Sequence, residues 1–206
     1  MTNQALTKNM TQYFFLQSVS SREYEAGEIL FDHLSDNPNV NGIAYPPFKA
    51  KSLRDMENFV NNIIASVNAN DKIVFYVDIH SDERTFTFKD ILSQNKADFT
   101  EYHPWECLNG MINMLYEKFG RNILVIFISC FSSVYFSSLK SPHVYVIAAE
   151  GKVNPMIARQ MLNRLYDEIC KNENVEQAYN EMTREFPIEE EQRKTDIYKA
   201  VLKLFK

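Results

Sequence analysis

Two reactive side chains stand at the ends of two strongly apolar segments of the chain. His80 closes the segment 72–80, and Cys130 closes the segment 122–130. A cysteine attacks as the thiolate, and a free thiol with a pKa of about 8.5 is only a few per cent ionised at neutral pH. A nearby imidazole can remove the thiol proton and later donate a proton to a leaving amine. The two residue types therefore suit nucleophilic catalysis, provided that the fold brings them together.

Both segments have the composition of buried parallel strands. They are apolar on both faces and rich in β-branched and aromatic residues, as expected where helices cover both sides of a sheet. One predicted helix, residues 104–119, lies between them, so the two strands could be neighbours in the sheet. Because ligands of open α/β sheets bind beyond the carboxyl ends of the strands, His80 and Cys130 are candidates for a shared site.

The rest of the chain alternates between strand and helix patterns. Strands are also predicted at 12–19, 40–45, 85–88 and 143–149. Helices are predicted at about 22–34, 52–67, 104–119, 154–171, 175–185 and 189–205, and residues 98–103 and 132–142 are predicted to be loops. Such alternation indicates βαβ units with right-handed crossovers. We expect one domain over residues 1–206, a three-layer α/β fold with a mostly parallel central sheet and helices on both faces.

Composition and charge narrow the class of protein. The chain has 206 residues, 45% of them hydrophobic, which is enough for one sizeable core. The net charge is −5 and no long basic stripe is present, so nucleic-acid binding is not expected. The apolar run 123–128 is far shorter than the roughly 20 residues of a membrane helix. Since residues 1–10 also lack the apolar core of a secretion signal, we expect a cytoplasmic protein without membrane contact.

The sequence offers little sign of a metal or cofactor site. Three cysteines without a CxxC pair, and four scattered histidines, argue against a disulfide framework or a structural zinc site. No glycine-rich phosphate loop is present, so no cofactor is expected. Cys107 and Cys170 lie on predicted helices and are expected in the core. His33 lies near the apolar stripe of a helix and is expected to be half-buried.

The segments around the two reactive residues resemble the motifs of caspase-like cysteine peptidases, and most closely the CHAT-domain and separase-like branch. The similarity is carried by Val77-Asp-Ile-His-Ser81 and by Val125-Ile-Phe-Ile-Ser-Cys-Phe-Ser-Ser133. Further along, Val144-Tyr-Val-Ile-Ala-Ala-Glu-Gly151 and Asn174-Val-Glu-Gln-Ala-Tyr179 match the usual ending of the family in order and spacing. The resemblance covers about residues 14–182 and implies a caspase-like sandwich.

The resemblance implies a thiol endopeptidase that hydrolyses a peptide bond in a protein substrate without a metal or an organic cofactor. His80 would be the general acid and base, Cys130 the nucleophile, and the backbone N–H groups of Ser81 and Cys130 the oxyanion hole. Two departures stand out. Ser81 replaces the glycine of many members and so loses the freedom of glycine at positive φ. Ile128 and Phe131 flank Ser129-Cys130, where metacaspase-type members carry an acidic residue.

Two carboxylates are candidates for binding the substrate. Asp78 precedes His80 by two positions and therefore shares its strand face, and Glu150 ends a nearby strand. Either could line a pocket for Lys or Arg through a charge-assisted contact. Equally, Asp78 could hydrogen-bond loop backbone, and Glu150 could cap the following turn.

Other classes of function remain open at this level. The fold could serve as a catalytically inactive interaction or adaptor module, which the serine at position 81 favours. A small-molecule hydrolase using the same cysteine is a third reading. A peptidase of this size needs a trigger, which a regulatory protein partner or a homodimer could supply. The amphipathic stretch 198–205 is expected to pack on its own domain rather than on a partner.

Overall fold

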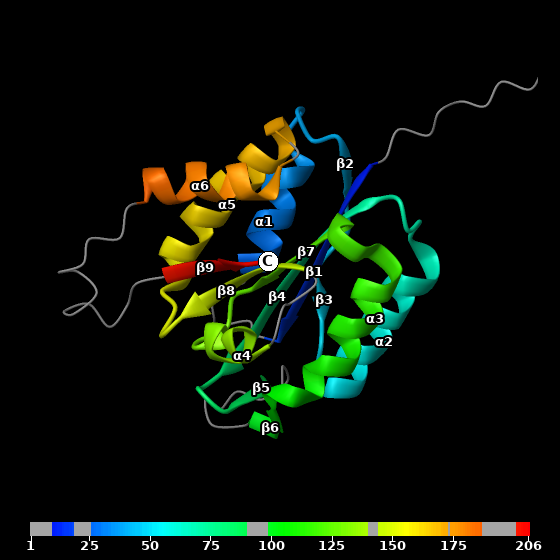
Figure 1. The fold of residues 1–206 in the computed structure, drawn as a ribbon, viewed down its shortest axis with the longest axis vertical. Coiled ribbons are helices and arrows are strands. Elements are labelled where there is room, and N and C mark those ends of the chain that lie inside the picture. The colour runs from blue at the N-terminus through cyan, green and yellow to red at the C-terminus, as the bar shows by residue number, and fades with distance from the viewer. Residues whose placement is uncertain (1–9, 19–25, 90–98, 140–143, 173, 187–200) are drawn as a thin grey trace, which may run out of the picture.

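The computed structural model describes residues 10–18, 26–89, 99–139, 144–172, 174–186 and 201–206. Within them, the main path of a nine-stranded sheet has the order β2-β1-β4-β7-β8-β9 (Figure 1). The strands from β2 to β8 pair in parallel, and β9 runs antiparallel to β8. The bounds along this path are β2 (Gly42–Ala44), β1 (Thr11–Ser18), β4 (Lys72–Ser81), β7 (Ile123–Phe127), β8 (Tyr145–Glu150) and β9 (Val201–Phe205).

Helices cover both faces of the sheet, as the sequence predicted. On one face lie α2 (Leu53–Ser66) and α3 (Asn109–Phe119); on the other lie α1 (Ala26–Ser35), α5 (Pro155–Asn172) and α6 (Val175–Glu185) (Figure 1). Alternate side chains of β4 enter the two cores: Phe75 and Val77 face α2 and α3, while Val74 and Tyr76 face α1 and α5. The protein is thus a three-layer α/β sandwich.

Polar caps start two of these helices where the sequence predicted. The Ser52 hydroxyl accepts a hydrogen bond of 3.2 Å from the Asp55 N–H at the start of α2. The Asn154 side chain accepts one of 3.0 Å from the Met156 N–H at the start of α5. Such caps satisfy backbone donors that have no partner within the helix.

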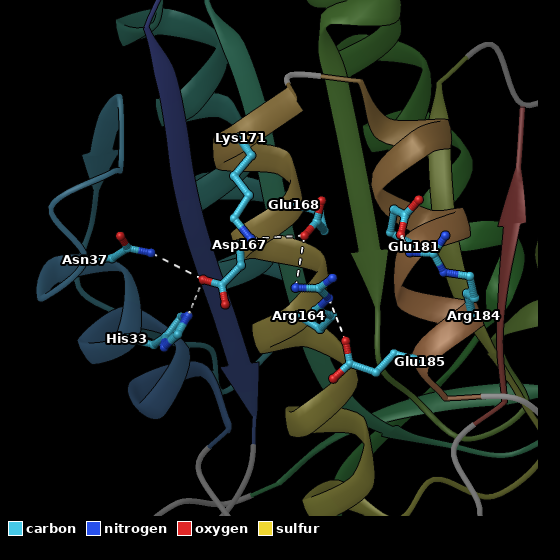
Figure 2. Close-up of polar contacts among 9 residues, drawn as sticks. All are labelled: His33, Asn37, Arg164, Asp167, Glu168, Lys171, Glu181, Arg184 and Glu185. Atoms are coloured by element: carbon cyan, nitrogen blue, oxygen red, sulfur yellow. Dashed lines mark hydrogen bonds and ion pairs between the residues drawn. The ribbon is translucent and has the colours of Figure 1, made fainter.

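Hydrogen bonds and ion pairs link the outer helices (Figure 2). The His33 Nε2 on α1 lies 2.9 Å from Asp167 Oδ1 on α5, and His33 is half-buried as expected. Arg164 on α5 binds Glu185 on α6 at 2.8 Å and Glu168, one turn along α5, at 3.0 Å. These contacts fix α1 and α6 against α5.

The prediction of a final helix over 189–205 is wrong in its last part. Residues 187–200 lie outside the described residues, but Val201–Phe205 form strand β9, which pairs with β8. Leu202 is 1% exposed, and the Tyr179 hydroxyl donates a 2.8 Å hydrogen bond to its carbonyl oxygen. The C-terminal stretch does pack on its own domain, because the edge of β8 supplies partners for its backbone groups.

Two segments that were predicted to be loops contain a helix or a strand. In the segment 132–142, α4 (Ser132–Ser138) forms a short helix. In the segment 98–103, β6 (Phe99–Pro104) pairs with β5 (Thr85–Lys89), which in turn pairs with the end of β4. The short strand β3 (Phe48–Lys49), which pairs with β1, was not predicted either. Both α4 and the β5–β6 ribbon lie at the same end of the sheet (Figure 1).

Cys107 is exposed rather than part of the core. It lies in the 3₁₀ turn Trp105–Leu108, where Trp105 and Leu108 are the buried residues. A 3₁₀ turn has three residues per turn, so positions three apart share the inner side and Cys107 points outward. Within the described residues, no helix has the length and apolar character that crossing a membrane would need.

Candidate active site at the carboxyl edge of the sheet

His80 and Cys130 lie at the carboxyl ends of two neighbouring parallel strands. Val77 of β4 is opposite Phe127 of β7, and the Ile128 N–H extends this ladder by a 2.8 Å hydrogen bond to the Val77 carbonyl. His80 is one of the last two residues of β4, and Cys130 follows the end of β7. The structure therefore brings both residues to one edge of the sheet, as their positions in the sequence predicted.

Two serines join the end of β4 to the turn that carries Cys130. The Ser81 hydroxyl donates a hydrogen bond of 2.5 Å to the carbonyl oxygen of Cys130. The Ile79 N–H donates one of 3.4 Å to the hydroxyl of Ser129, which is almost fully buried. These contacts hold the backbone of Cys130 against β4, a role for the Ser81 side chain that the sequence did not indicate.

The turn after Cys130 is strained. Among the described residues, Phe131 is the only non-glycine residue with a positive φ, 62°. Its N–H donates a 2.8 Å hydrogen bond to the carbonyl oxygen of Gly151. A left-handed conformation costs a residue with a Cβ roughly 1–2 kcal/mol, and such strain concentrates at functional sites. Cys130 thus sits immediately before a sharp strand-to-helix turn.

Ser132, the first residue of α4, stabilises this turn through hydrogen bonds of its side chain. Its hydroxyl donates a 3.0 Å hydrogen bond to the Phe127 carbonyl and accepts one of 2.9 Å from the Ala149 N–H. Ser132 therefore joins the ends of β7 and β8, and it is fully buried. Fixed backbone on both sides of Cys130 gives its sulfur a defined position at the edge.

The backbone N–H of Ser81 points toward β7. The Asp82 N–H donates a 2.9 Å hydrogen bond to the Thr85 carbonyl, so Asp82 and Thr85 form a hydrogen-bonded pair of the β4–β5 ladder. Pairs alternate in an antiparallel ladder, so the next pair, Ser81 and Phe86, is not hydrogen-bonded. The Ser81 N–H is thus directed away from β5, on the side where the Ile79 N–H meets Ser129.

The three cysteines differ in their surroundings. Cys130 is partly exposed at the carboxyl edge, and Cys107 is exposed in its 3₁₀ turn. Cys170 of α5 lies 3.4 Å from the Tyr13 hydroxyl oxygen, and burial raises the pKa of its thiol. Cys170 therefore behaves as a half-buried packing residue, close to the prediction that placed it in the core.

The two candidate substrate carboxylates lie on different strands. Asp78 shares the α1 side of β4 with Tyr76, whose hydroxyl donates a 3.1 Å hydrogen bond to Asp78 Oδ2. Glu150 ends β8 and binds the Nζ of Lys203 on β9 at 2.7 Å. Because β7 separates β4 from β8, the structure does not bring Asp78 and Glu150 together.

Gln17 also lies at the carboxyl edge of the sheet, and the sequence did not identify it as a site residue. It lies in register with Asp78 and is 0% exposed, yet among the described residues neither atom of its side-chain amide has a hydrogen-bond partner. A Cβ placed on Gly27 would lie 2.6 Å from Gln17 Oε1, so the amide is directed at the first turn of α1. The available signal was a polar residue interrupting an apolar strand.

Other parts of the molecule have fewer groups that could take part in a reaction. Within the described residues, no group of three or more His, Cys, Asp or Glu side chains could hold a metal ion. A hollow of about 220 Å³ lies at the opposite, amino edge of the sheet, where its lining includes Lys72, Arg121, Tyr145 and Glu176. None of the predicted site residues lines this hollow.

Comparison with known proteins adds little to this description. No protein-family model matches the chain, and no curated protein matches it. Among solved structures, protein GSU0716 from Geobacter sulfurreducens is similar with a TM-score of 0.43 and 10% identity, over 95% of this chain and 92% of that one. We therefore infer function from the residues at the carboxyl edge.

Proposed function

We propose that this protein is a cysteine endopeptidase of the caspase-like class, with Cys130 as the nucleophile and His80 as the general acid and base. The observation that carries the proposal is their placement at the carboxyl ends of the adjacent parallel strands β4 and β7. The braced turn around Cys130 adds support, since a nucleophile needs a fixed position near its base.

The proposed reaction is acyl transfer to sulfur followed by hydrolysis. His80 takes the proton of the Cys130 thiol, and the thiolate attacks the carbonyl carbon of the substrate. The N–H groups of Ser81 and Cys130 stabilise the resulting oxyanion. The protonated imidazole then donates its proton to the leaving amine, leaving an acyl-enzyme. Water, deprotonated by His80, attacks the thioester and releases the acid and the free thiol.

Asp78 is the stronger of the two candidates for a substrate pocket. It lies on the same strand and the same face as His80, two positions away. Glu150 already binds Lys203, which neutralises its charge. A carboxylate at Asp78 would suit a Lys or Arg side chain through a charge-assisted contact. We also propose that the protein is cytoplasmic. A regulatory protein partner or a second copy of the chain would supply its trigger.

A second candidate function is a non-catalytic adaptor with the same fold. The serine at position 81 favours it, because it stands where many members of the family that the chain resembles have glycine and lacks the freedom of glycine at positive φ. An adaptor would keep the fold and the braced turn but would show no dependence of thiol chemistry on His80.

Labelling with an electrophilic peptide separates the two candidates. We expect an acyloxymethyl ketone peptide to modify Cys130 ahead of the more exposed Cys107, and His80→Ala to slow this reaction by at least about a hundredfold. Cys107→Ala is the matched control and should leave the labelling of Cys130 unchanged. Equal labelling of all three cysteines in the folded protein would contradict the peptidase and leave the adaptor.

A further inference from the structure

We propose that the Gln17 side chain binds the side chain of the substrate residue and selects a primary carboxamide, as in Gln or Asn. This inference rests on the proposed peptidase function, because it names the substrate class of the same edge. It differs from the Lys or Arg preference expected from Asp78 alone, and the two preferences can be separated by experiment.

The inference starts from a buried amide that the protein leaves without a partner. Gln17 is fully buried, and both Nε2 and Oε1 lack hydrogen bonds to the part of the chain that the structure describes. Gln12, on the same strand and 7% exposed, shows the usual arrangement. Its Nε2 donates to Asp71 at 2.6 Å, and its Oε1 accepts from the Tyr45 hydroxyl at 3.1 Å. Unpaired buried polar groups cost stability, and this one lies at the candidate active edge, where it offers a bound substrate a donor and an acceptor.

The position of Gln17 suits contact with a residue bound at Cys130. Gln17 is opposite Asp78 on β4, one position beyond the Val77–Phe127 pair that joins β4 to β7. Two strand spacings across the sheet, and two residues along it, would separate the Cα atoms of Gln17 and Cys130 by about 12 Å if β7 continued in register to Cys130. The side chain of Gln17 and that of a substrate residue together span this distance.

The side chain of Gln17 also lies on the correct face. In β1, Tyr13 and Phe15 face α1 and α5, and the alternation of the strand places Gln17 with them. The same alternation in β4 places Asp78 and His80 on that face. A substrate side chain that extends along this face from His80 would therefore meet Asp78 first and Gln17 next.

Hydrogen-bonding capacity selects the ligand group. A glutamine amide presents one acceptor oxygen and an NH₂ donor. Ammonium and guanidinium groups only donate, so they would leave Nε2 of Gln17 unpaired, and a carboxylate only accepts and would repel Asp78. A primary carboxamide satisfies both atoms of Gln17 in a two-bond pair and keeps a second N–H for Asp78.

Gly27 lets the Gln17 amide approach the first turn of α1 closely. A Cβ at this position would lie 2.6 Å from Gln17 Oε1 and 3.6 Å from Tyr76 Cε1. Because the nearer atom is the end of a flexible side chain, Gly27→Ala should displace the amide rather than the helix. This variant therefore perturbs the proposed contact without removing Gln17.

The test measures labelling of Cys130 by acyloxymethyl ketone peptides that differ only in the side chain next to the reactive group: Gln, Asn, Lys, Arg, Asp or norleucine. We expect the Gln or Asn probe to react at least about tenfold faster than the Lys and norleucine probes. Gln17→Met and Gly27→Ala should each reduce this preference. Labelling of Cys130 that favours Lys or Arg, or shows no preference, would overturn the inference alone, whereas failure of every probe would overturn the proposed peptidase.

Thermal unfolding gives a readout that does not depend on catalysis. Gln17→Met removes an unpaired amide, so we expect the Tm to stay unchanged or to rise. Gln12→Met, the matched control, leaves Asp71 and Tyr45 without their partner and should lower the Tm. A fall for Gln17→Met as large as that for Gln12→Met would show that the Gln17 amide is paired within the protein and would overturn the inference.

Discussion

The Ser81 hydroxyl donates a 2.5 Å hydrogen bond to the carbonyl oxygen of Cys130, a residue 49 positions further along the chain. This contact links the end of β4, which carries His80, to the turn that carries Cys130. It gives the serine a structural role at a position where the motif that it resembles often has glycine. The Ser81 N–H meanwhile points toward β7.

Ser81→Ala should weaken both the fold and the reactivity of Cys130. The loss of one hydrogen bond to a partly buried carbonyl should lower the free energy of unfolding by about 1 kcal/mol. Electrophilic labelling of Cys130 should slow because its backbone is less firmly held. Ser66→Ala is the control, since the Ser66 hydroxyl donates a similar bond to the Asn62 carbonyl at an exposed position of α2. Equal labelling of Cys130 in both variants would show that the Ser81 contact does not position the sulfur.

The left-handed residue after Cys130 predicts an unusual order of stability. Phe131 has a φ of 62°, so Phe131→Gly should be more stable than Phe131→Ala by about 1 kcal/mol in urea unfolding. Val134, an exposed position in α4, should show the reverse order by a similar amount, because alanine favours helices. A more stable alanine variant at both positions would be inconsistent with strain in this turn.

Strand β9 should contribute substantially to stability. Leu202 is buried between β9 and the helices on its face, so Leu202→Ala should cost about 2–4 kcal/mol in chemical unfolding. Lys203 is nearly half exposed and pairs with Glu150, so Lys203→Ala should cost less than about 1 kcal/mol. Similar small effects of both substitutions would mean that β9 is not packed on the domain.

The β4–β5 turn should become less stable in acid. Hydrogen bonds from the Arg84 N–H and then the Thr85 N–H hold the pKa of Asp82 below its usual value. Because the pKa is lower in the folded than in the unfolded protein, this stabilisation is complete above about pH 4 and is lost as the pH falls through the folded value.

The difference in stability between the wild type and Asp82→Ala should therefore shrink below about pH 4. Trp105, the only tryptophan, can report it by fluorescence, since its Nε1 donates a 3.2 Å hydrogen bond to the Asp82 carbonyl. Glu83→Ala, at the exposed neighbouring position, is the control and should show no such trend. A difference that stays constant from pH 7 to pH 3 would contradict this assignment.

The sequence predicted the parts of the fold that have strong local patterns. The segments of β4 and β7 are apolar on both faces, and Ser52 and Asn154 mark helix starts through their caps. His80 and Cys130 lie at the same edge of the sheet because the carboxyl ends of neighbouring parallel strands lie at the same edge. These features depend on residues close in the chain, which is why they could be predicted.

The elements that were missed depend on distant contacts. Strand β9 is a five-residue apolar segment that could be helix or strand, and only pairing with β8 decides. Helix α4 is serine-rich and is held by packing, including Tyr135 stacked on Trp105. The unpaired amide of Gln17 is likewise invisible in the sequence, since it follows from the register of β1 with β4 and from the position of Gly27.

The most direct test of the account is the rate at which iodoacetamide alkylates each cysteine at pH 6.5, followed by mass spectrometry in the wild type and in His80→Gln. If His80 activates Cys130, Cys130 should react faster than the more exposed Cys107 in the wild type. In His80→Gln the rate at Cys130 should fall at least about tenfold while that at Cys107 stays unchanged. A rate at Cys130 that is slower than at Cys107 and insensitive to His80→Gln would contradict the proposed catalytic pair.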